Sequence, residues 1–250
     1  MAVLGIDIGG SGIKGAPVNV SAGEFLDERY RILTPAPGRP DQVIEVIHRI
    51  VDHFEWEGKI GVGFPGVVQH GVVKTAANVS SEWKNQDLAL MIKEATGCFT
   101  VAINDADAAG LAEMQFGIGK EYKDGFVLFL TVGTGIGSAF FVKGKLWPNS
   151  EMGHLKVRGK DAEDRAGDAT RKKEELSWKR WGKRLREVLE IYDFLFSPDV
   201  IIIGGGVSKK FINYSKYLKG VHADVVPAQL LNQAGIIGAA IAAEESIIID

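Results

Sequence analysis

Residues 3–15 read VLGIDIGGSGIKG, and residues 126–142 read FVLFLTVGTGIGSAFFV. Each stretch predicts an apolar strand, a glycine-rich bend and a second strand. Glycine permits positive φ and close approach of the backbone, so such a bend can aim bare N–H groups at an anion such as phosphate. Either copy alone is equally compatible with a plain β-hairpin whose turn needs glycine. Two matched copies in one chain favour a pair of phosphate-binding bends.

The two bends differ in their polar side chains. The first combines Asp7, Ser11 and Lys14 with Gly9 and Gly10. A carboxylate there can hold Mg²⁺ through its waters, while the hydroxyl and the ammonium can donate to phosphoryl oxygens. The second bend has donors but no central acid, and its candidates are Thr131, Gly133, Thr134 and Gly135. We therefore expect a metal side at the first bend and a donor side at the second.

Length and composition permit a large core and disfavour several classes of protein. The chain has 250 residues, 46% of them hydrophobic, which suits one large domain or two smaller lobes. A formal net charge of −3 gives no global attraction to nucleic acid or to a membrane. The single cysteine, Cys98, rules out an intrachain disulfide and a multi-cysteine zinc site. Without a secretory pattern or an apolar run of roughly 20 residues, we expect a cytoplasmic protein.

The order of the predicted elements indicates an α/β fold. A strand is expected near residues 25–33, a buried strand at 59–68, and a strand running into a helix at 101–110. Helices are predicted over 41–54, 86–96, 177–195 and from 233 onward. DVIIIGGGVS at 199–208 predicts a buried strand, a glycine turn and a helix N-terminus, a geometry suited to an anion.

Asn104 and Asp105 fall where a predicted strand meets a predicted helix, at an edge expected to face a cleft. Phosphoryl transfer to an alcohol needs a group that accepts the hydroxyl proton, and Asp105 is the candidate base. The alternative is that Asp105 only caps the helix. Asp107 is the weaker candidate because it falls inside the helical turn.

A second polar group, Glu151 and His154 in NSEMGHL, follows the second bend. A carboxylate and an imidazole can bind the vicinal hydroxyls of a polyol. Metal binding or an ordinary polar loop are the alternatives. Asn78 and Glu163 are further candidates for hydroxyl contacts, although each alone also fits a solvated turn or helix.

Residues 156–187 are locally basic, which is the one clear shift in composition. A solvated helical face is the usual meaning of such a run. Beside two phosphate-type bends, however, a strip of cations could bind a long polyanion. Nucleic acid is not expected, because no helix-turn-helix, RNP or zinc-finger pattern occurs.

Several segments, taken in order, resemble the ROK family of sugar kinases over nearly the whole chain. They are DIGGSGIKG at 7–15, GVGFPGVV at 61–68, INDADAAG at 103–110, TVGTGIGSA at 131–139, NSEMGHL at 149–155, LSWKRW at 176–181 and IIIGGGVSKK at 201–210. The NSEMGHL and LSWKRW segments favour the branch of the family that uses polyphosphate as donor.

The resemblance implies two RNase H-like α/β lobes of the actin-like ATPase/hexokinase superfamily, with an interlobe cleft. We expect a small lobe of residues 1–107, completed by a helix at 235–250, and a larger lobe of residues 108–234. Glucose would bind in the cleft, and Asp105 would act as base on its 6-hydroxyl. The residues implied to hold the sugar are Asn78, Asn104, Asp105, Glu151, His154 and Glu163.

The resemblance also implies the donor side of the reaction. Asp7 would lie near Mg²⁺, and the transferred phosphates would contact Gly9, Gly10, Ser11, Lys14, Thr131, Gly133, Thr134 and Gly135. Gly204 and Gly205 match the loop that faces a nucleotide in ATP-using relatives. Lys172, Lys173, Lys179 and Arg180 are the expected polyphosphate strip. Structural zinc is not expected, because the cysteine-rich motif of many family members is missing here, and family members are commonly homodimers.

The expected function is transfer of a phosphoryl group from inorganic polyphosphate, and from ATP as a possible second donor, to glucose, giving glucose 6-phosphate. Two alternatives stay open. One is an ATP-dependent hexokinase of the same family acting on glucose or an N-acetylhexosamine. The other is a sugar-responsive binding or regulatory protein without turnover, which Asp7, Lys14 and Asp105 argue against.

Overall fold

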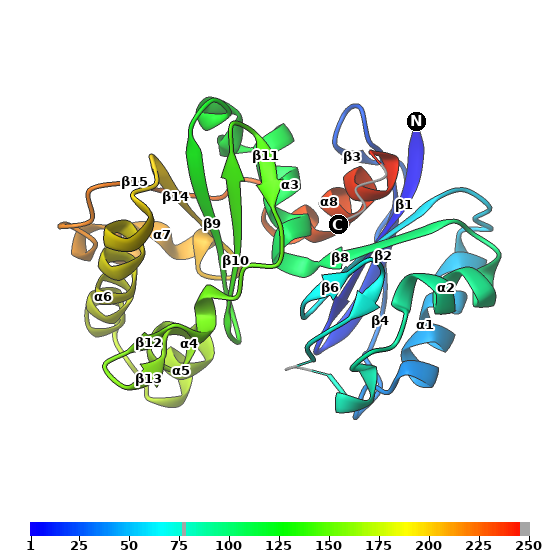
Figure 1. Cartoon of the computed structure of the whole chain (residues 1–250), viewed down its shortest axis with the longest axis horizontal. Helices are drawn as coiled ribbons and strands as arrows, with labels where there is room; N and C mark the ends of the chain where they lie inside the picture. Colours follow the sequence, from blue (N-terminus) through cyan, green and yellow to red (C-terminus); the bar gives the residue numbers. More distant parts are fainter. Residues whose placement is uncertain (77–78, 246–250) are drawn as a thin grey trace. The chain divides into compact units, whose positions relative to one another are not determined.

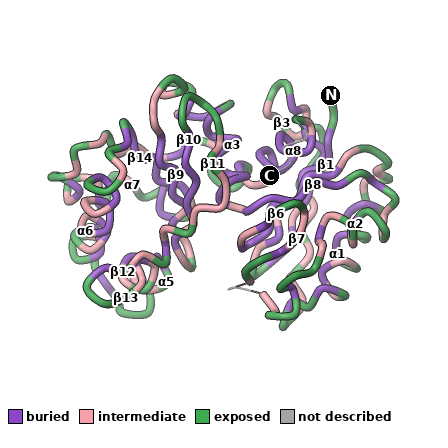
Figure 2. Tube along the Cα trace, in the orientation of Figure 1, coloured by how far each residue is buried: buried purple, intermediate pink, exposed green. Residues whose placement is uncertain are grey.

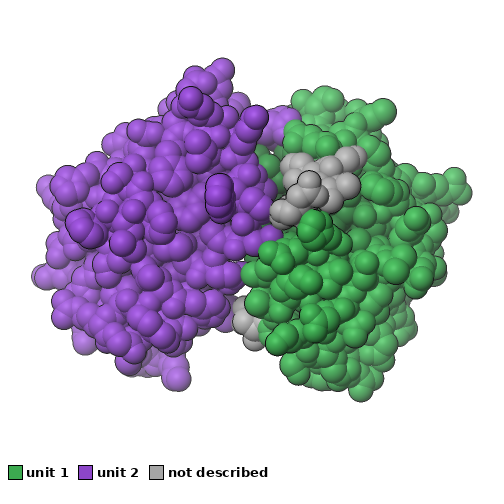
Figure 3. All heavy atoms as spheres, in the orientation of Figure 1, with its two compact units in different colours: residues 1–112, 233–250 green, residues 113–232 purple. Residues whose placement is uncertain are grey.

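The computed structural model describes residues 1–76 and 79–245, and the chain divides into two compact units (Figure 3). Unit 1 comprises residues 1–112 and 233–250, and unit 2 comprises residues 113–232. The chain passes from unit 1 to unit 2 within helix α3 (Asp105–Phe116) and returns just before helix α8 (Ala234–Glu244).

Unit 1 is built on a mixed sheet of the order β3-β2-β1-β5-β8, with β4 also paired to β2 (Figure 1). Its strands are β1 (Ala2–Gly9), β2 (Gly12–Asn19), β3 (Glu24–Phe25), β4 (Tyr30–Ile32), β5 (Ile60–Phe64) and β8 (Thr100–Asn104). The β1–β2 hairpin is antiparallel, whereas β1, β5 and β8 run parallel. A small antiparallel ribbon of β6 (Val68–Gln69) and β7 (Val72–Val73) follows β5.

Helices pack on both faces of the unit 1 sheet. Leu4, Ile6 and Ile8 of β1 share one buried cluster with apolar residues of α1 (Pro40–His53) and α2 (Leu88–Thr96). Helix α8, drawn in red in Figure 1, packs on β1 and β5. A Cβ on Gly5 or Gly61 would collide with the α8 backbone. Glycine in the strands and small residues in α8 therefore let helix and sheet approach closely.

Unit 2 repeats the strand pattern of unit 1. Its sheet has the order β11-β10-β9-β14-β15, with strands β9 (Phe126–Val132), β10 (Ile136–Val142), β11 (Lys145–Trp147), β14 (Val200–Gly204) and β15 (Asp224–Pro227). The first three are antiparallel neighbours, and β9, β14 and β15 run parallel. The two predicted strand–bend–strand stretches thus occupy equivalent places in two sheets. Figure 2 shows that β1 and β9 are largely buried.

Helix α6 (Trp178–Phe196) is the longest helix in the described part of unit 2, and the predicted helix over 177–195 is confirmed. Its buried face packs on the sheet and includes Trp181, Leu185, Val188, Leu189 and Tyr192. Smaller elements, β12 (Lys156–Val157), β13 (Lys160–Asp161), α4 (Ala162–Ala166) and α5 (Asp168–Lys173), precede it. No helix in the described part of the chain is long and apolar enough to span a membrane.

Three local predictions need correction. The strand predicted near 25–33 is two short strands, β3 and β4. Helix α2 begins at Leu88 rather than near residue 86, because the Asp87 side chain caps it by accepting from Leu90 N at 2.9 Å. After β14, the expected helix N-terminus is only a 3₁₀ turn (Ser208–Lys210) and the four-residue α7 (Phe211–Tyr214). That segment offers no extended helix to an anion.

Candidate functional site

The first bend is a tight hairpin between β1 and β2. Gly9 pairs with Gly12, so Gly10 and Ser11 form the turn. Two positions down the hairpin, Lys14 lies opposite Asp7, and its Nζ donates to Asp7 Oδ2 at 3.0 Å. Both side chains are partly exposed, at 25% and 19%, so the pair can still meet a ligand. The structure brings the predicted acid and amine of this bend together.

Asp105 lies at the same edge of the unit 1 sheet as this pair. Because β1, β5 and β8 are parallel, their carboxyl ends meet at one edge. Asp7 pairs with Gly63 of β5, and a Cβ on Gly63 would lie 3.5 Å from the Asp105 Cα. With strands about 4.8 Å apart, one intervening strand separates the backbones of Asp7 and Asp105 by roughly 10 Å. The edge thus presents a cation, a carboxylate pair and the start of a helix within reach of one small substrate.

Asn104, not Asp105, caps helix α3. Its Oδ1 accepts from Ala106 N at 2.8 Å and from Asp107 N at 3.1 Å, and its Nδ2 donates to the Gly66 carbonyl at 3.1 Å. The alternative that Asp105 is the cap is therefore wrong. Asp105 is the first residue of α3 and is partly exposed, whereas Asn104 is only 4% exposed. Asn104 fixes the helix start and the β5–β6 turn at once.

The second bend is held by the segment that follows it in unit 2. The Gly133 carbonyl accepts from Asp168 N at 2.8 Å and from Ala169 N at 3.2 Å. A Cβ on Gly133 would meet no atom within 4 Å, which leaves open space at the bend. A Cβ on Gly135, in contrast, would collide with Glu163 Oε2.

The conformation and the neighbours of the glycines at these bends show which of them the structure needs. Neither Gly133 nor Gly135 has a positive φ, and neither do Gly9 and Gly12 of the first bend. The left-handed conformation is therefore not what selects glycine there. Close approach of neighbouring groups explains Gly12 and Gly135, whereas neither a positive φ nor a close contact requires glycine at Gly133.

A third glycine segment adjoins the second bend. Since β9 and β14 are parallel, Gly204 pairs with Thr131. Gly205 has φ +73°, and a Cβ there would lie 2.7 Å from Val132 N. Here both the left-handed backbone and the close contact require glycine. Unit 2 therefore gathers Thr131, Thr134 and the two predicted glycines at one edge of its sheet.

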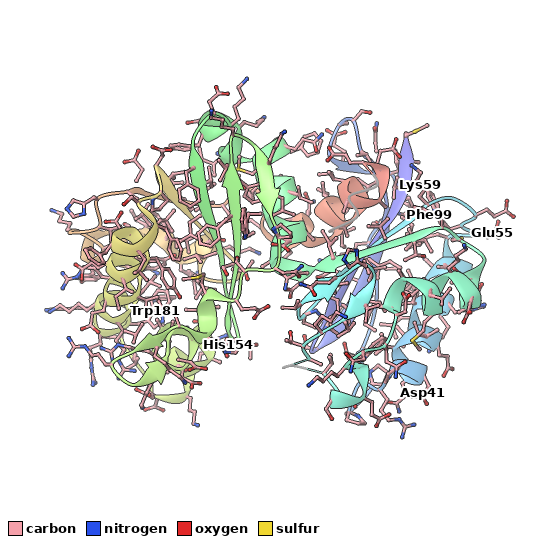
Figure 4. All side chains as sticks on the ribbon, viewed as in Figure 1. Asp41, Glu55, Lys59, Phe99, His154 and Trp181 are labelled. Atoms are coloured by element: carbon pink, nitrogen blue, oxygen red, sulfur yellow. The ribbon has the colours of Figure 1, made fainter. Side chains whose placement is uncertain are left out.

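Glu151, His154 and Glu163 form one polar cluster in unit 2 (Figure 4 labels His154). His154 Nε2 lies 3.7 Å from Glu151 Oε2, and its Nδ1 lies 3.9 Å from Glu163 Oε1. Glu163 Oε2 accepts from Ile136 N at 3.2 Å, so this carboxylate also anchors the second bend. The structure thus brings these three predicted residues together.

Asp161 belongs to the same cluster but was not predicted from the sequence. Its Oδ2 lies 3.1 Å from His154 Nδ1, and it also pairs with Lys156. The β12–β13 ribbon carries Asp161 back beside His154, and two-residue strands leave little signal in a sequence. Asp161 therefore fixes the orientation of the imidazole.

The loop that carries Glu151 is pinned by buried groups. The Ser138 hydroxyl donates to the Ser150 carbonyl at 2.8 Å and accepts from Met152 N at 3.0 Å. The Tyr192 hydroxyl of α6 donates to the Met152 carbonyl at 2.6 Å. The loop is therefore a preformed part of the unit rather than an ordinary solvated turn.

The charges of this cluster shift one another. The hydrogen bond to Asp161 raises the pKa of His154, and the nearby carboxylates of Glu163 and Glu151 raise it further. Burial raises the pKa of Glu151, with the Glu163 charge adding to the increase and the imidazolium opposing it. The cluster thus favours an imidazolium whose Nδ1 donates to Asp161 and whose Nε2 can donate to an oxygen atom of a ligand.

Several cations of the basic stretch, residues 156–187, are already engaged in ion pairs. Asp168 pairs with Arg171 at 2.7 Å and with Lys172 at 2.8 Å. Glu174 pairs with Arg184 at 2.7 Å. Within the described residues, the exposed Lys173, Lys179 and Arg180 make no ion pair within 4.0 Å, as the strip hypothesis requires. Lys172 meets that hypothesis only in part.

Two predicted features need separate mention. Asn78 lies outside the described residues. The residues at Asp7 suit a magnesium ion that arrives with phosphate: one carboxylate is present, and Gly235 leaves room, since a Cβ there would lie 3.3 Å from Asp7 Oδ1. Mg²⁺ commonly binds through one or two carboxylates, substrate phosphates and waters. In residues 1–76 and 79–245, no cluster of three or more His, Cys, Asp or Glu could hold a metal alone.

The family model of the ROK family matches residues 3–169. The chain belongs to the ROK family. It is 46% identical over 240 residues to the polyphosphate glucokinase of Mycobacterium tuberculosis (strain CDC 1551 / Oshkosh), covering 96% of this chain and 90% of that protein. The Mycobacterium leprae (strain TN) polyphosphate glucokinase is 43% identical over 245 residues, covering 98% of this chain and 75% of that protein.

A solved structure agrees with this family assignment. The inorganic polyphosphate/ATP-glucomannokinase from Arthrobacter sp. strain KM matches with a TM-score of 0.93 and 44% identity, covering 98% of this chain and 99% of that chain. The predicted α/β fold, with two RNase H-like lobes of the actin-like ATPase/hexokinase superfamily, is confirmed.

We predict that Asp161→Asn lowers the pKa of His154 toward about 6.5, the ordinary value for histidine, because the hydrogen bond to the carboxylate is its largest cause. The imidazolium would then be lost at a lower pH than in the parent protein. NMR titration of the imidazole signals measures the pKa, with His154→Gln identifying the signal. Asp164→Asn, on the exposed face of α4, is the matched control and should leave the titration unchanged. An unaltered pKa in Asp161→Asn would contradict the assignment.

Proposed function

We propose that this chain transfers the terminal phosphoryl group of inorganic polyphosphate to the 6-hydroxyl of glucose, giving glucose 6-phosphate. ATP would serve as a second donor. The observation that carries the proposal is the placement of Asp105 at the same sheet edge as the Asp7–Lys14 pair. The relatives named polyphosphate glucokinase support the choice of donor and acceptor.

Asp105 would accept the proton of the sugar hydroxyl as that oxygen attacks the terminal phosphorus. The bond between that phosphorus and the bridging oxygen breaks, and the shortened polyphosphate leaves with the electron pair. Asn104 supports this role, because its cap fixes the backbone on which Asp105 lies. We therefore propose that Asn104 acts first through position, with sugar contact as a further role.

Lys14 would donate to phosphoryl oxygens, together with Ser11 and the backbone at Gly9 and Gly10. Asp7 would hold Mg²⁺ through its waters, and that ion, when bound with the donor, neutralises phosphate charge. In unit 2 we propose that Thr131, Gly133, Thr134 and Gly135 contact the donor. Gly204 and Gly205 would face the nucleotide when ATP is the donor.

We propose that Glu151, His154 and Glu163 bind sugar hydroxyls, together with Asn104 and Asn78. A carboxylate accepts from a hydroxyl, while the imidazolium donates to one, so the cluster can read a polyol. Glu163 would have two roles, because one of its oxygens accepts from Ile136 N and anchors the second bend, while the residue would also bind the sugar. A homodimer is a further proposal that rests on family resemblance, and a cytoplasmic location is one that rests on the composition of the sequence.

The alternatives are outcomes of one substrate panel. Purified protein with Mg²⁺ is offered polyphosphate or ATP, each with glucose, mannose or N-acetylglucosamine, and sugar phosphate is measured. Glucose 6-phosphate from polyphosphate supports the proposal. Turnover with ATP alone would show an ATP-dependent hexokinase, and sugar binding without any transfer would show a binding protein.

We expect Asp105→Asn to lower kcat by roughly 10² to 10⁴, the usual contribution of a positioned base, with both donors alike. Initial rates of glucose 6-phosphate formation measure the loss, and calorimetry should show that glucose still binds. Asp87→Asn is the matched control: it makes the same change at the cap of α2 in the same unit, where Asn caps as well as Asp, and it should leave kcat unchanged. A kcat within about twofold of the parent would remove Asp105 from the chemistry.

For the strip we expect that changing Lys172, Lys173, Lys179 and Arg180 to Gln raises KM for long polyphosphate more than KM for ATP. A long polyanion meets several cations at once, and the effect should shrink at high salt. Four exposed lysines elsewhere in unit 2, Lys120, Lys123, Lys143 and Lys145, give a control of equal charge change. Equal effects on both donors, or an equal effect of the control, would contradict the strip.

A further inference from the structure

Arg31 lies against the first bend but has no part in the function proposed so far. We propose that its guanidinium binds a phosphoryl group of the donor next to the one that Lys14 meets, while positioning the bend. This inference rests on the proposed function and adds a donor-binding residue to it.

The sheet places Arg31 in a row with the two charged residues of the bend. Strand β2 pairs with β1 and with β4, so Lys14 lies directly opposite Asp7 on one side and Arg31 on the other. Directly opposite residues of antiparallel strands point to the same face of a sheet. Asp7, Lys14 and Arg31 therefore form one row of side chains across three strands.

Arg31 also contacts the bend itself. Its Nη2 donates to the Ser11 carbonyl at 3.0 Å. A Cβ on Gly12 would collide with Nε of the guanidinium and lie 2.9 Å from Nη2. Gly12 lacks a positive φ, and in this arrangement the guanidinium occupies the space that a Cβ would fill. The sequence motif GSG thus contains a glycine that makes room for a cation.

A second residue of the same segment orients the bend. The Thr34 hydroxyl donates to the Gly9 carbonyl at 2.5 Å. In a planar trans peptide the N–H points away from the carbonyl, so the Gly10 N–H points away from Thr34. Arg31 and Thr34 thus donate to the Ser11 and Gly9 carbonyls of the bend, and the Gly10 N–H points away from Thr34.

The charge of the row favours an anion. Lys14 is paired with Asp7, whereas Arg31, in the described part of the chain, has no ion pair within 4.0 Å. The row therefore carries one negative and two positive groups. A guanidinium has five N–H donors in a planar fork that matches phosphate oxygens, and only one contact is made to Ser11. Exposed donors remain for a ligand.

The test is direct binding of tripolyphosphate with Mg²⁺, measured by calorimetry without glucose so that no turnover is needed. Arg31→Gln retains an N–H for the Ser11 carbonyl but loses the charge, and Arg31→Lys retains the charge but loses the fork. We expect Kd to rise about five- to twentyfold in Arg31→Gln, with a smaller rise in Arg31→Lys, as for loss of a charge-assisted hydrogen bond. The melting temperature should stay close to that of the parent.

Arg29→Gln is the matched control, since it removes the same charge from an exposed position two residues earlier. Wild-type affinity in Arg31→Gln, or an equal loss in Arg29→Gln, would overturn the inference. A melting temperature that falls together with affinity in both Arg31 variants would also overturn it, because the arginine would then only brace the bend. Glucose 6-phosphate formation by the parent tests the proposed function separately.

Discussion

The candidate site depends on the hydrogen bonds of the Asn104 carboxamide. The carboxamide makes three hydrogen bonds, two to the first turn of α3 and one to the Gly66 carbonyl, and it is almost fully buried. A buried amide with satisfied donors and acceptors fixes both segments that it joins, since breaking any bond would leave a polar group unpaired. These hydrogen bonds therefore join the end of β5, the end of β8 and the start of α3. Asp105, the first residue of α3, is held in place by them.

The rest of the site follows from the direction of the strands. Parallel β1, β5 and β8 end at one edge, which gathers Asp7, Lys14 and Asp105 although they come from distant parts of the chain. Unit 2 repeats the arrangement with β9 and β14, which gathers Thr131 and Gly204. One edge carries acids and a cation, and the other carries hydroxyls and glycines. The same strand pattern thus supplies two different chemistries.

The sequence predicted the longer strands, the principal helices and the residues at their ends, because apolar periodicity and glycine bends are local signals. It did not predict Asp161, which reaches His154 through a two-residue ribbon, or Arg31, which reaches the bend through strand pairing. It also assigned the cap of α3 to Asp105 as an alternative, since Asn and Asp are equally good caps and only geometry separates them. The ion pairs within the basic stretch were missed for the same reason: composition gives charge but not partners.

We propose that Asn104 positions Asp105 for proton transfer, and kcat of the Asn104→Ala variant tests this most directly. Loss of the three hydrogen bonds would let the start of α3 shift, and misplacement of a catalytic group by about 1 Å can cost on the order of 10² in rate. We predict a kcat for glucose 6-phosphate formation lower by roughly tenfold to a hundredfold with both polyphosphate and ATP. An unchanged kcat, with only KM for glucose raised, would contradict the account and leave Asn104 as a sugar contact alone.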